Sequence, residues 1–206
     1  MERSEIIDNS FGRKFGFEKY KEILELASET DLSGDLLARF ERLFNDYYDV
    51  RRNEDWRNIF YSYFLENRSN KELTFEQIIE YLYDNAKTNH GRKYPVEASF
   101  SSKMLSVINP NMPIIDSQVL KNMGLTIAGK NPLEKSESAK VVYKTICDRY
   151  NGFLKSPECQ MAIEYFDLYF PNYKEFSIVK KLDWFLWSME REELIGLGIF
   201  GELINE

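Results

Sequence analysis

Hydrophobic residues recur along this chain with a period close to 3.6, and no segment alternates between apolar and polar positions as a half-buried strand does. The pattern predicts an all-α protein of about eight to ten helices, each about ten to sixteen residues long. The expected helices cover approximately residues 17–27, 35–47, 54–64, 75–89, 97–108, 117–123, 139–150, 157–170 and 178–189.

The intervening segments are expected to be irregular. Residues 126–136 are predicted to form a loop, and residues 192–204, with three glycines, a weak final turn that packs loosely. A chain of 206 residues with 43% hydrophobic composition is long enough to bury a substantial core, which predicts a single domain covering residues 1–206. Two helical halves, at about 17–90 and 139–206, would flank a central element at 95–124 and share a cleft.

The central element combines three prolines with a short apolar helix on each side. Its first helix is expected to end before Pro110, because the residue preceding a proline is driven out of the α region. Residues 113–115 should then be extended and buried. Asp116 or Ser117 can cap the second helix, and Gly124 is expected to end it.

Two residues of this element have chemical potential. Lys103 lies between Phe100 and Val107 at helical spacing, at the edge of the expected buried face. Asp116 follows an extended segment that spans at most about 20 Å, whereas Lys103 lies only about 7.5 Å of helix rise before the end of its helix. The chain is therefore able to bring the amine and the carboxylate into one cleft.

The residues around these two side chains resemble a known family. Ser101, Ser102 and Lys103, then an apolar run, then Met-Pro-Ile-Ile-Asp-Ser-Gln-Val at 112–119, resemble the core of the helix-hairpin-helix DNA glycosylases, the superfamily of the 8-oxoguanine and adenine glycosylases. In that family a hairpin leads into a helix with a catalytic lysine, and an extended segment delivers an essential aspartate at a helix N-terminus. The chain resembles a divergent member.

The resemblance implies a base-excision glycosylase and AP lyase acting on a damaged purine, such as 8-oxoguanine, in double-stranded DNA. Asp116 would stabilise the oxocarbenium-like sugar, and Lys103 would attack C1′ and form a Schiff base that permits strand cleavage. Partial burial would favour the uncharged amine that this attack requires. Ser102, Ser117 and Gln118 adjoin the two residues and are the candidate substrate contacts. No cofactor and no metal is implied.

A purely structural interpretation fits the same residue types. A lysine at a helix edge commonly covers apolar surface with its stem while its amine stays hydrated. An aspartate before Ser-Gln-Val commonly acts as an N-cap. Asp183, within an apolar helix, needs a partner if it is buried, and Lys180 on the same face would suffice.

The net charge of −7 has the wrong sign for a general nucleic-acid binder, because phosphate contacts depend on clustered Lys and Arg. Local basic residues are the candidate DNA contacts: Arg51, Arg52, Arg92 and Lys93. The alternative is a solvated charge mosaic. The helix at 54–64 carries many aromatic residues, which either stack on an extruded base or belong to the core.

No apolar run approaches the roughly 20 residues of a membrane-spanning helix, and the first residues are charged, so a cytoplasmic protein without membrane contact is expected. Cys147 and Cys159 lack metal-ligand spacing, and a single histidine excludes a His-rich zinc site. A second function remains open: the acidic charge and the absence of glycine from the hairpin segment also fit a catalytically inactive helical module that binds a protein partner, of phage, plasmid or defence origin.

Overall fold

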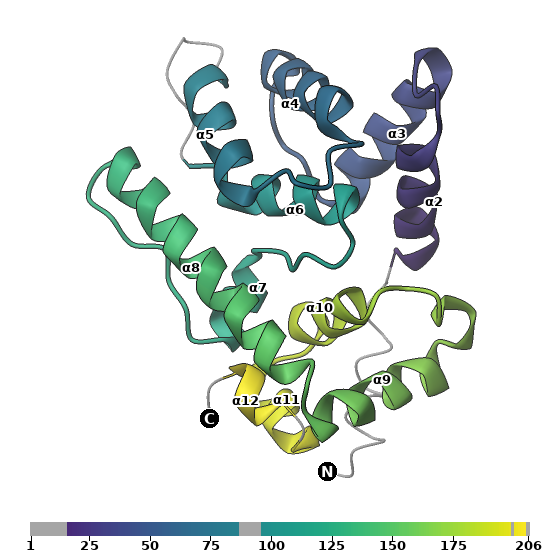
Figure 1. The fold of residues 1–206 in the computed structure, drawn as a ribbon, viewed down its shortest axis with the longest axis vertical. Helices are drawn as coiled ribbons and strands as arrows, with labels where there is room; N and C mark the ends of the chain where they lie inside the picture. Colours follow the sequence, from purple (N-terminus) through teal and green to yellow (C-terminus); the bar gives the residue numbers. More distant parts are fainter. Residues whose placement is uncertain (1–15, 87–95, 199, 205–206) are drawn as a thin grey trace. The chain divides into compact units, whose positions relative to one another are not determined.

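The structure is a computed structural model that describes residues 16–86, 96–198 and 200–204 (Figure 1). These residues form helices joined by turns and loops, with no β-strand among them, so the all-α prediction is confirmed. The chain divides into an N-terminal unit, residues 16–109, and a C-terminal unit that begins at Pro110. This boundary runs through the expected central element at 95–124, and the helix-hairpin-helix motif itself stays a prediction.

The N-terminal unit is built around one buried helix. Its elements are α2 (Phe17–Ser28), α3 (Gly34–Tyr47), α4 (Glu54–Asn67), α5 (Phe75–Asn85) and α6 (Ala98–Ile108). Helices α2 and α5 both pack against α6, and α2 also packs against α3 (Figure 1). Nearly every side chain of α6 is buried, including its serines and its lysine.

Side-chain caps explain where two of these helices begin. The Thr74 hydroxyl accepts a hydrogen bond from the Gln77 backbone N–H at 3.3 Å, and the Gln77 side chain accepts one from the Thr74 N–H at 2.9 Å. This is the capping box expected from the sequence. Asn53 caps α4 by accepting from the Trp56 N–H at 3.0 Å. Both caps satisfy backbone donors that a helix start leaves unpaired.

Most of the aromatic residues of α4 belong to the core of the N-terminal unit. Trp56, Phe60 and Phe64 are almost completely buried. Phe64 stacks on Phe40 of α3 with ring centroids 4.7 Å apart, and Trp56 stacks on Phe60 at 4.9 Å. Of the two interpretations of this aromatic density, the core interpretation is therefore correct, since these rings have no face open to an extruded base.

The C-terminal unit is likewise built around one buried helix, α10. Its elements are α7 (Ser117–Asn122), α8 (Pro132–Phe153), α9 (Pro157–Tyr169), the 3₁₀ turn η1 (Pro171–Tyr173), α10 (Ile178–Ser188), α11 (Arg191–Leu197) and α12 (Gly201–Ile204). Helices α7 and α9 pack against α10, and α12 packs against α8 (Figure 1). Helix α10 buries two lysines and an aspartate beside its apolar residues.

Two sequence-based expectations for this unit are wrong. Helix α8 begins at Pro132, inside the predicted loop at 126–136, because Asn131 accepts a hydrogen bond from the Glu134 N–H at 3.0 Å and proline suits the first helical position. The C-terminal residues do not pack loosely either, since most of the apolar side chains described in this segment are fully buried, although Ile195 is 40% exposed. The fully buried residues are Leu194, Leu197, Phe200, Leu203 and Ile204.

Within the described part of the chain, no helix combines the length and the hydropathy needed to cross a lipid bilayer.

Candidate functional site

Lys103 lies near the middle of α6 and is only 8% exposed. Its Nζ atom is 5.4 Å from the centroid of the Tyr48 ring and 5.5 Å from that of Phe100. These distances are within the range of a cation–π interaction. The interpretation of Lys103 as a surface lysine with a hydrated amine is therefore wrong, because the amine lies among aromatic rings.

Arg52 lies against the same aromatic ring as Lys103. Its guanidinium carbon is 5.2 Å from the Phe100 centroid, and its Nε and an Nη donate to the two carboxylate oxygens of Glu97 at 3.0 and 3.2 Å. Glu97 is buried, and this burial raises the pKa of its carboxyl although Arg52 opposes the shift. Tyr48, Arg52, Glu97, Phe100 and Lys103 are called the aromatic-cation cluster below.

The other candidate residues of this unit have simpler surroundings. Ser102 is fully buried, and its hydroxyl donates to the Ser99 carbonyl at 2.9 Å. Arg51 is exposed, and its Nε donates to Asp49 at 2.9 Å, a contact that raises the pKa of the arginine. Arg92 and Lys93 lie outside the described residues. The assignment of these residues to substrate or DNA stays a prediction.

Asp116 occupies the position predicted for it in the C-terminal unit. Residues 113–115 are irregular and buried, and Asp116 follows in an extended conformation as the N-cap of α7. Its Oδ1 accepts a hydrogen bond from the Gln118 backbone N–H at 3.0 Å and lies 3.4 Å from the Ser117 hydroxyl, which is exposed. Gly124 follows α7 with φ +63°, as expected of a glycine that ends a helix.

Polar side chains bind α7 to the end of α10. Asn122 is fully buried, and its Nδ2 donates to the carbonyls of Leu186 and Met189 at 2.7 and 2.8 Å. Gln118 Nε2 donates to the same Met189 carbonyl at 3.2 Å. These bonds satisfy carbonyls that the end of α10 leaves unpaired. Gln118 was singled out from the sequence as a substrate contact, whereas Asn122 was not recognised.

A buried ionisable group lies beside the segment that carries Asp116. Asp183 of α10 is 2% exposed, and its Oδ1 accepts a hydrogen bond from the Tyr150 hydroxyl at 2.6 Å. Burial raises the pKa of Asp183 to about 7, and the Asp116 charge adds to the rise. Lys180, the Tyr150 hydroxyl and the Ile114 backbone oppose it. Lys180 is thus an electrostatic partner, as expected, but Tyr150 was not foreseen.

The segment before Asp116 is held at several points along its length. The Ser177 hydroxyl donates to the Pro110 carbonyl at 2.5 Å, and the Tyr143 hydroxyl donates to the Pro113 carbonyl at 3.0 Å. The Ile114 backbone N–H donates to Asp183. Residues from α8 and from the start of α10 therefore fix the course of residues 110–115. We call this set of contacts the segment anchor.

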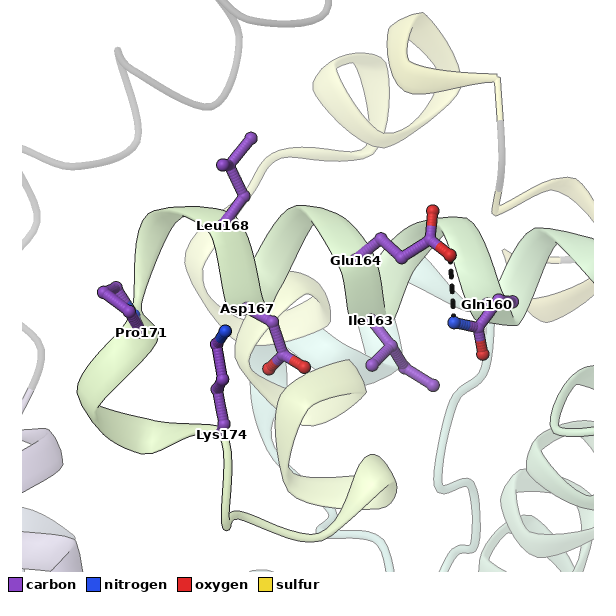
Figure 2. A pocket seen from close by; sticks show the side chains of 7 residues that line it. All are labelled: Gln160, Ile163, Glu164, Asp167, Leu168, Pro171 and Lys174. Atoms are coloured by element: carbon purple, nitrogen blue, oxygen red, sulfur yellow. Dashed lines mark hydrogen bonds between the residues drawn. The ribbon is translucent and has the colours of Figure 1, made fainter.

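A surface hollow of about 460 Å³ lies along α9 and η1 (Figure 2). Ile163, Asp167, Leu168 and Lys174 are among its lining residues. The Asp167 carboxylate accepts a hydrogen bond from the buried Lys181 at 2.6 Å, so its charge is already paired. The hollow contains none of the residues singled out from the sequence.

Lys103 belongs to the N-terminal unit and Asp116 to the C-terminal unit. Their meeting in one cleft stays a prediction. Among the described residues, no group of three or more His, Cys, Asp or Glu side chains is arranged to hold a metal ion. Comparisons with protein-family models, curated proteins and solved structures found no match to this chain.

Proposed function

We propose that the chain is a DNA base-excision glycosylase and AP lyase that acts on a damaged purine. Lys103 is the proposed nucleophile and Asp116 the proposed catalytic carboxylate. The observation that carries the proposal is the burial of the Lys103 amine among aromatic rings in the centre of α6. A lysine placed in this way is restrained in its rotamers, as a nucleophile has to be.

The surroundings of Lys103 support a role in chemistry. Lys103 is 8% exposed and its Nζ lies near the rings of Tyr48 and Phe100, so little water reaches this side chain. Arg52 and Glu97 form an ion pair beside the same Phe100 ring, so the cluster combines apolar faces with fixed charges.

The surroundings of Asp116 support the second role. As the N-cap of α7, its carboxylate accepts a backbone hydrogen bond and lies at the positive end of the helix. The segment anchor restrains the chain that precedes it. A carboxylate fixed in this way is suited to stabilising the positive charge that develops on the sugar as the base departs.

In the proposed reaction, the Lys103 amine forms a bond to C1′ while the bond from C1′ to the base breaks. The departing base takes the electron pair of that bond and a proton. The sugar ring then opens to give a Schiff base between Lys103 and C1′, and loss of the 3′ phosphate group by β-elimination cleaves the strand. Hydrolysis of the Schiff base restores the lysine.

Borohydride reduction tests this proposal, because it converts a Schiff base into a stable amine that links protein and DNA. Duplexes with single 8-oxoguanine, other damaged purines or an abasic site are incubated with the protein and borohydride. We expect a covalent adduct with the wild type and none with Lys103→Arg, which keeps the cation but does not form the imine. Lys71→Arg is the matched control, since Lys71 binds the carbonyl of Ile108 at the end of the same helix.

Asp116→Asn should release the base more slowly while it still binds the duplex. A full set of lesions that yields no adduct with the wild type would refute the enzymatic proposal. An adduct that persists in Lys103→Arg would assign the nucleophile to another amine.

We also propose an alternative, a catalytically inactive module that binds a protein partner. Apolar side chains exposed on the C-terminal unit favour it, among them Leu168, Val141 and Trp187, of which Leu168 is 71% and Val141 66% exposed. Arg51 and Arg52, two of the candidate DNA contacts, are each paired with a carboxylate. A stable complex with a protein, lost in Leu168→Asp, together with no salt-dependent DNA binding, would favour this function.

A further inference from the structure

We propose that Asp183 is a positioning residue, which holds residues 113–115 and thereby fixes the orientation of the Asp116 carboxylate at the start of α7. This inference rests on the proposed catalytic role of Asp116. Asp183 is too deeply buried to touch a substrate, so it acts through the chain that it binds.

The geometry connects Asp183 to Asp116 over a very short distance along the chain. Asp183 accepts hydrogen bonds from the Tyr150 hydroxyl and from the Ile114 backbone N–H. Ile114 is two residues before Asp116, and only Ile115, which is buried, lies between them. A change at Asp183 therefore reaches the cap of α7 through two peptide units that have little freedom to absorb it.

The other contacts of the segment anchor lie further from Asp116 along the chain than the contact with Asp183 does. Ser177 and Tyr143 bind the carbonyls of Pro110 and Pro113, which lie further from Asp116. Asn122 binds the opposite end of α7 to α10. Asp183 is thus the contact of the anchor that lies nearest to the proposed catalytic carboxylate along the chain, and it comes from the same helix that Asn122 binds.

Asp183 also makes the orientation of Asp116 sensitive to pH. The buried carboxyl titrates with a pKa of about 7, so it is part neutral and part charged near neutral pH. The neutral form accepts hydrogen bonds less strongly than the carboxylate. The ionisable groups around it are Tyr150 of α8, with Tyr143 and Cys147 nearby, Asp116 before α7, Lys180 on α10, and the Lys181–Asp167 pair between α10 and α9.

The Gln118 amide reports on this orientation without any catalytic assay, because it donates to Asp116 Oδ1. Its hydrogen-exchange rate is measured relative to that of the Met123 amide at the other end of α7, which cancels changes in global stability. We expect this ratio to rise about tenfold in Asp183→Asn and in Tyr150→Phe, as the loss of about one hydrogen bond predicts. Tyr150→Phe removes only a hydroxyl, so it takes the place of Asp183→Asn in this measurement if Asp183→Asn does not fold.

Leu203→Ala is the matched control, because it removes buried apolar volume from α12 of the same unit and leaves the anchor intact. It should leave the exchange ratio unchanged. In the wild type the Ile114 amide resonance should shift with a midpoint near pH 7, and in Asp183→Asn this shift should be absent.

Catalysis supplies a second readout. In single-turnover base release, Asp183→Asn should lower the rate about tenfold with unchanged affinity for the duplex, and the step near pH 7 in the wild-type rate profile should disappear. If the wild type forms no Schiff base, the proposed function fails, but the exchange ratio still tests the positioning role. An exchange ratio that is the same in wild type, Asp183→Asn and Tyr150→Phe would overturn it.

Discussion

Replacing Asp183 by asparagine should change the pH dependence of stability. The carboxyl titrates near pH 3.8 when exposed and near pH 7 in the folded chain, where burial is the main cause of the shift. The folded state therefore keeps this proton to higher pH than the unfolded state does. As pH rises from about 4 to about 7, the wild type loses stability, because the buried group is forced to ionise. Asparagine has no proton to lose.

The size of the effect follows from the shift. Each pH unit between the two pKa values is worth about 1.4 kcal/mol, so the wild type should lose on the order of 4 kcal/mol relative to Asp183→Asn. Below about pH 4 the difference between the two proteins should be constant, and above about pH 8 it should be constant again. Other shifted groups, such as Glu97, are present in both proteins and cancel in the comparison.

Urea denaturation of both proteins at intervals from about pH 4 to about pH 8 measures this difference. Tyr150→Phe sharpens the test, because the Tyr150 hydroxyl favours the ionised form of Asp183. Without that hydroxyl, the pKa of Asp183 should be higher and the loss of stability should extend to higher pH. A difference between wild type and Asp183→Asn that does not vary with pH would show that Asp183 is not a buried, titrating group.

Three further substitutions test other parts of the fold. Asn122→Ala removes the donor to the Leu186 carbonyl and one of the two donors to the Met189 carbonyl, and it should cost about 1–3 kcal/mol in urea denaturation. Lys121→Ala, at an exposed neighbouring position, should leave the stability nearly unchanged. Asn131→Ala should cost about 1 kcal/mol and speed amide exchange in the first turn of α8, and unchanged exchange there would contradict the cap. A Cβ atom added at Gly124 would meet no atom within 4 Å. Gly124→Ala should therefore lower the stability in thermal unfolding only by the backbone cost of a left-handed residue, about 1 kcal/mol. A loss above about 3 kcal/mol would show hidden crowding.

The helical period was sufficient to predict the fold class and most helices, because burial of an apolar stripe determines where a helix forms. The local structure of 113–124 also followed from the sequence, since proline, a capping residue and glycine each restrict the backbone at a known place. The start of α8 carried the same kind of signal, Asn131 before Pro132, but residues 133–138 hold few apolar residues to extend the period.

What the sequence did not reveal depends on contacts between distant residues. Lys103 was placed at the edge of a buried face, yet it lies inside, because Tyr48 from the end of α3 lies over it beside Phe100 of its own helix. Asp183 had an expected partner three residues away, but its hydrogen-bond donor Tyr150 is 33 residues distant. The glycines of 192–204 suggested loose packing, yet Leu197 and Phe200, which lie between them, are fully buried. Periodicity in the sequence identifies the buried face of a helix but not the residues that pack against that face.

The buried polar contacts of α10 come from two different neighbouring helices. Lys181 binds Asp167 of α9, and Asp183 binds Tyr150 of α8, so directional bonds from two neighbours hold the helix about its axis. Apolar packing alone has weaker directional preference, and buried polar groups often stabilise no more than apolar residues of similar volume. The double variant Asp183→Leu with Tyr150→Phe separates the two effects.

At about pH 8 this variant should be as stable as the wild type or more so, because it no longer buries a charged carboxylate. Its Gln118 amide should nevertheless exchange faster relative to Met123, since Ile114 has lost its acceptor. Urea denaturation and hydrogen exchange on one sample measure both quantities. Equal stability with an unchanged exchange ratio would mean that packing alone orients Asp116, and lower stability would mean that the buried pair stabilises the fold. The buried polar groups of α10 therefore serve either to orient Asp116 or to stabilise the fold, and this experiment distinguishes the two.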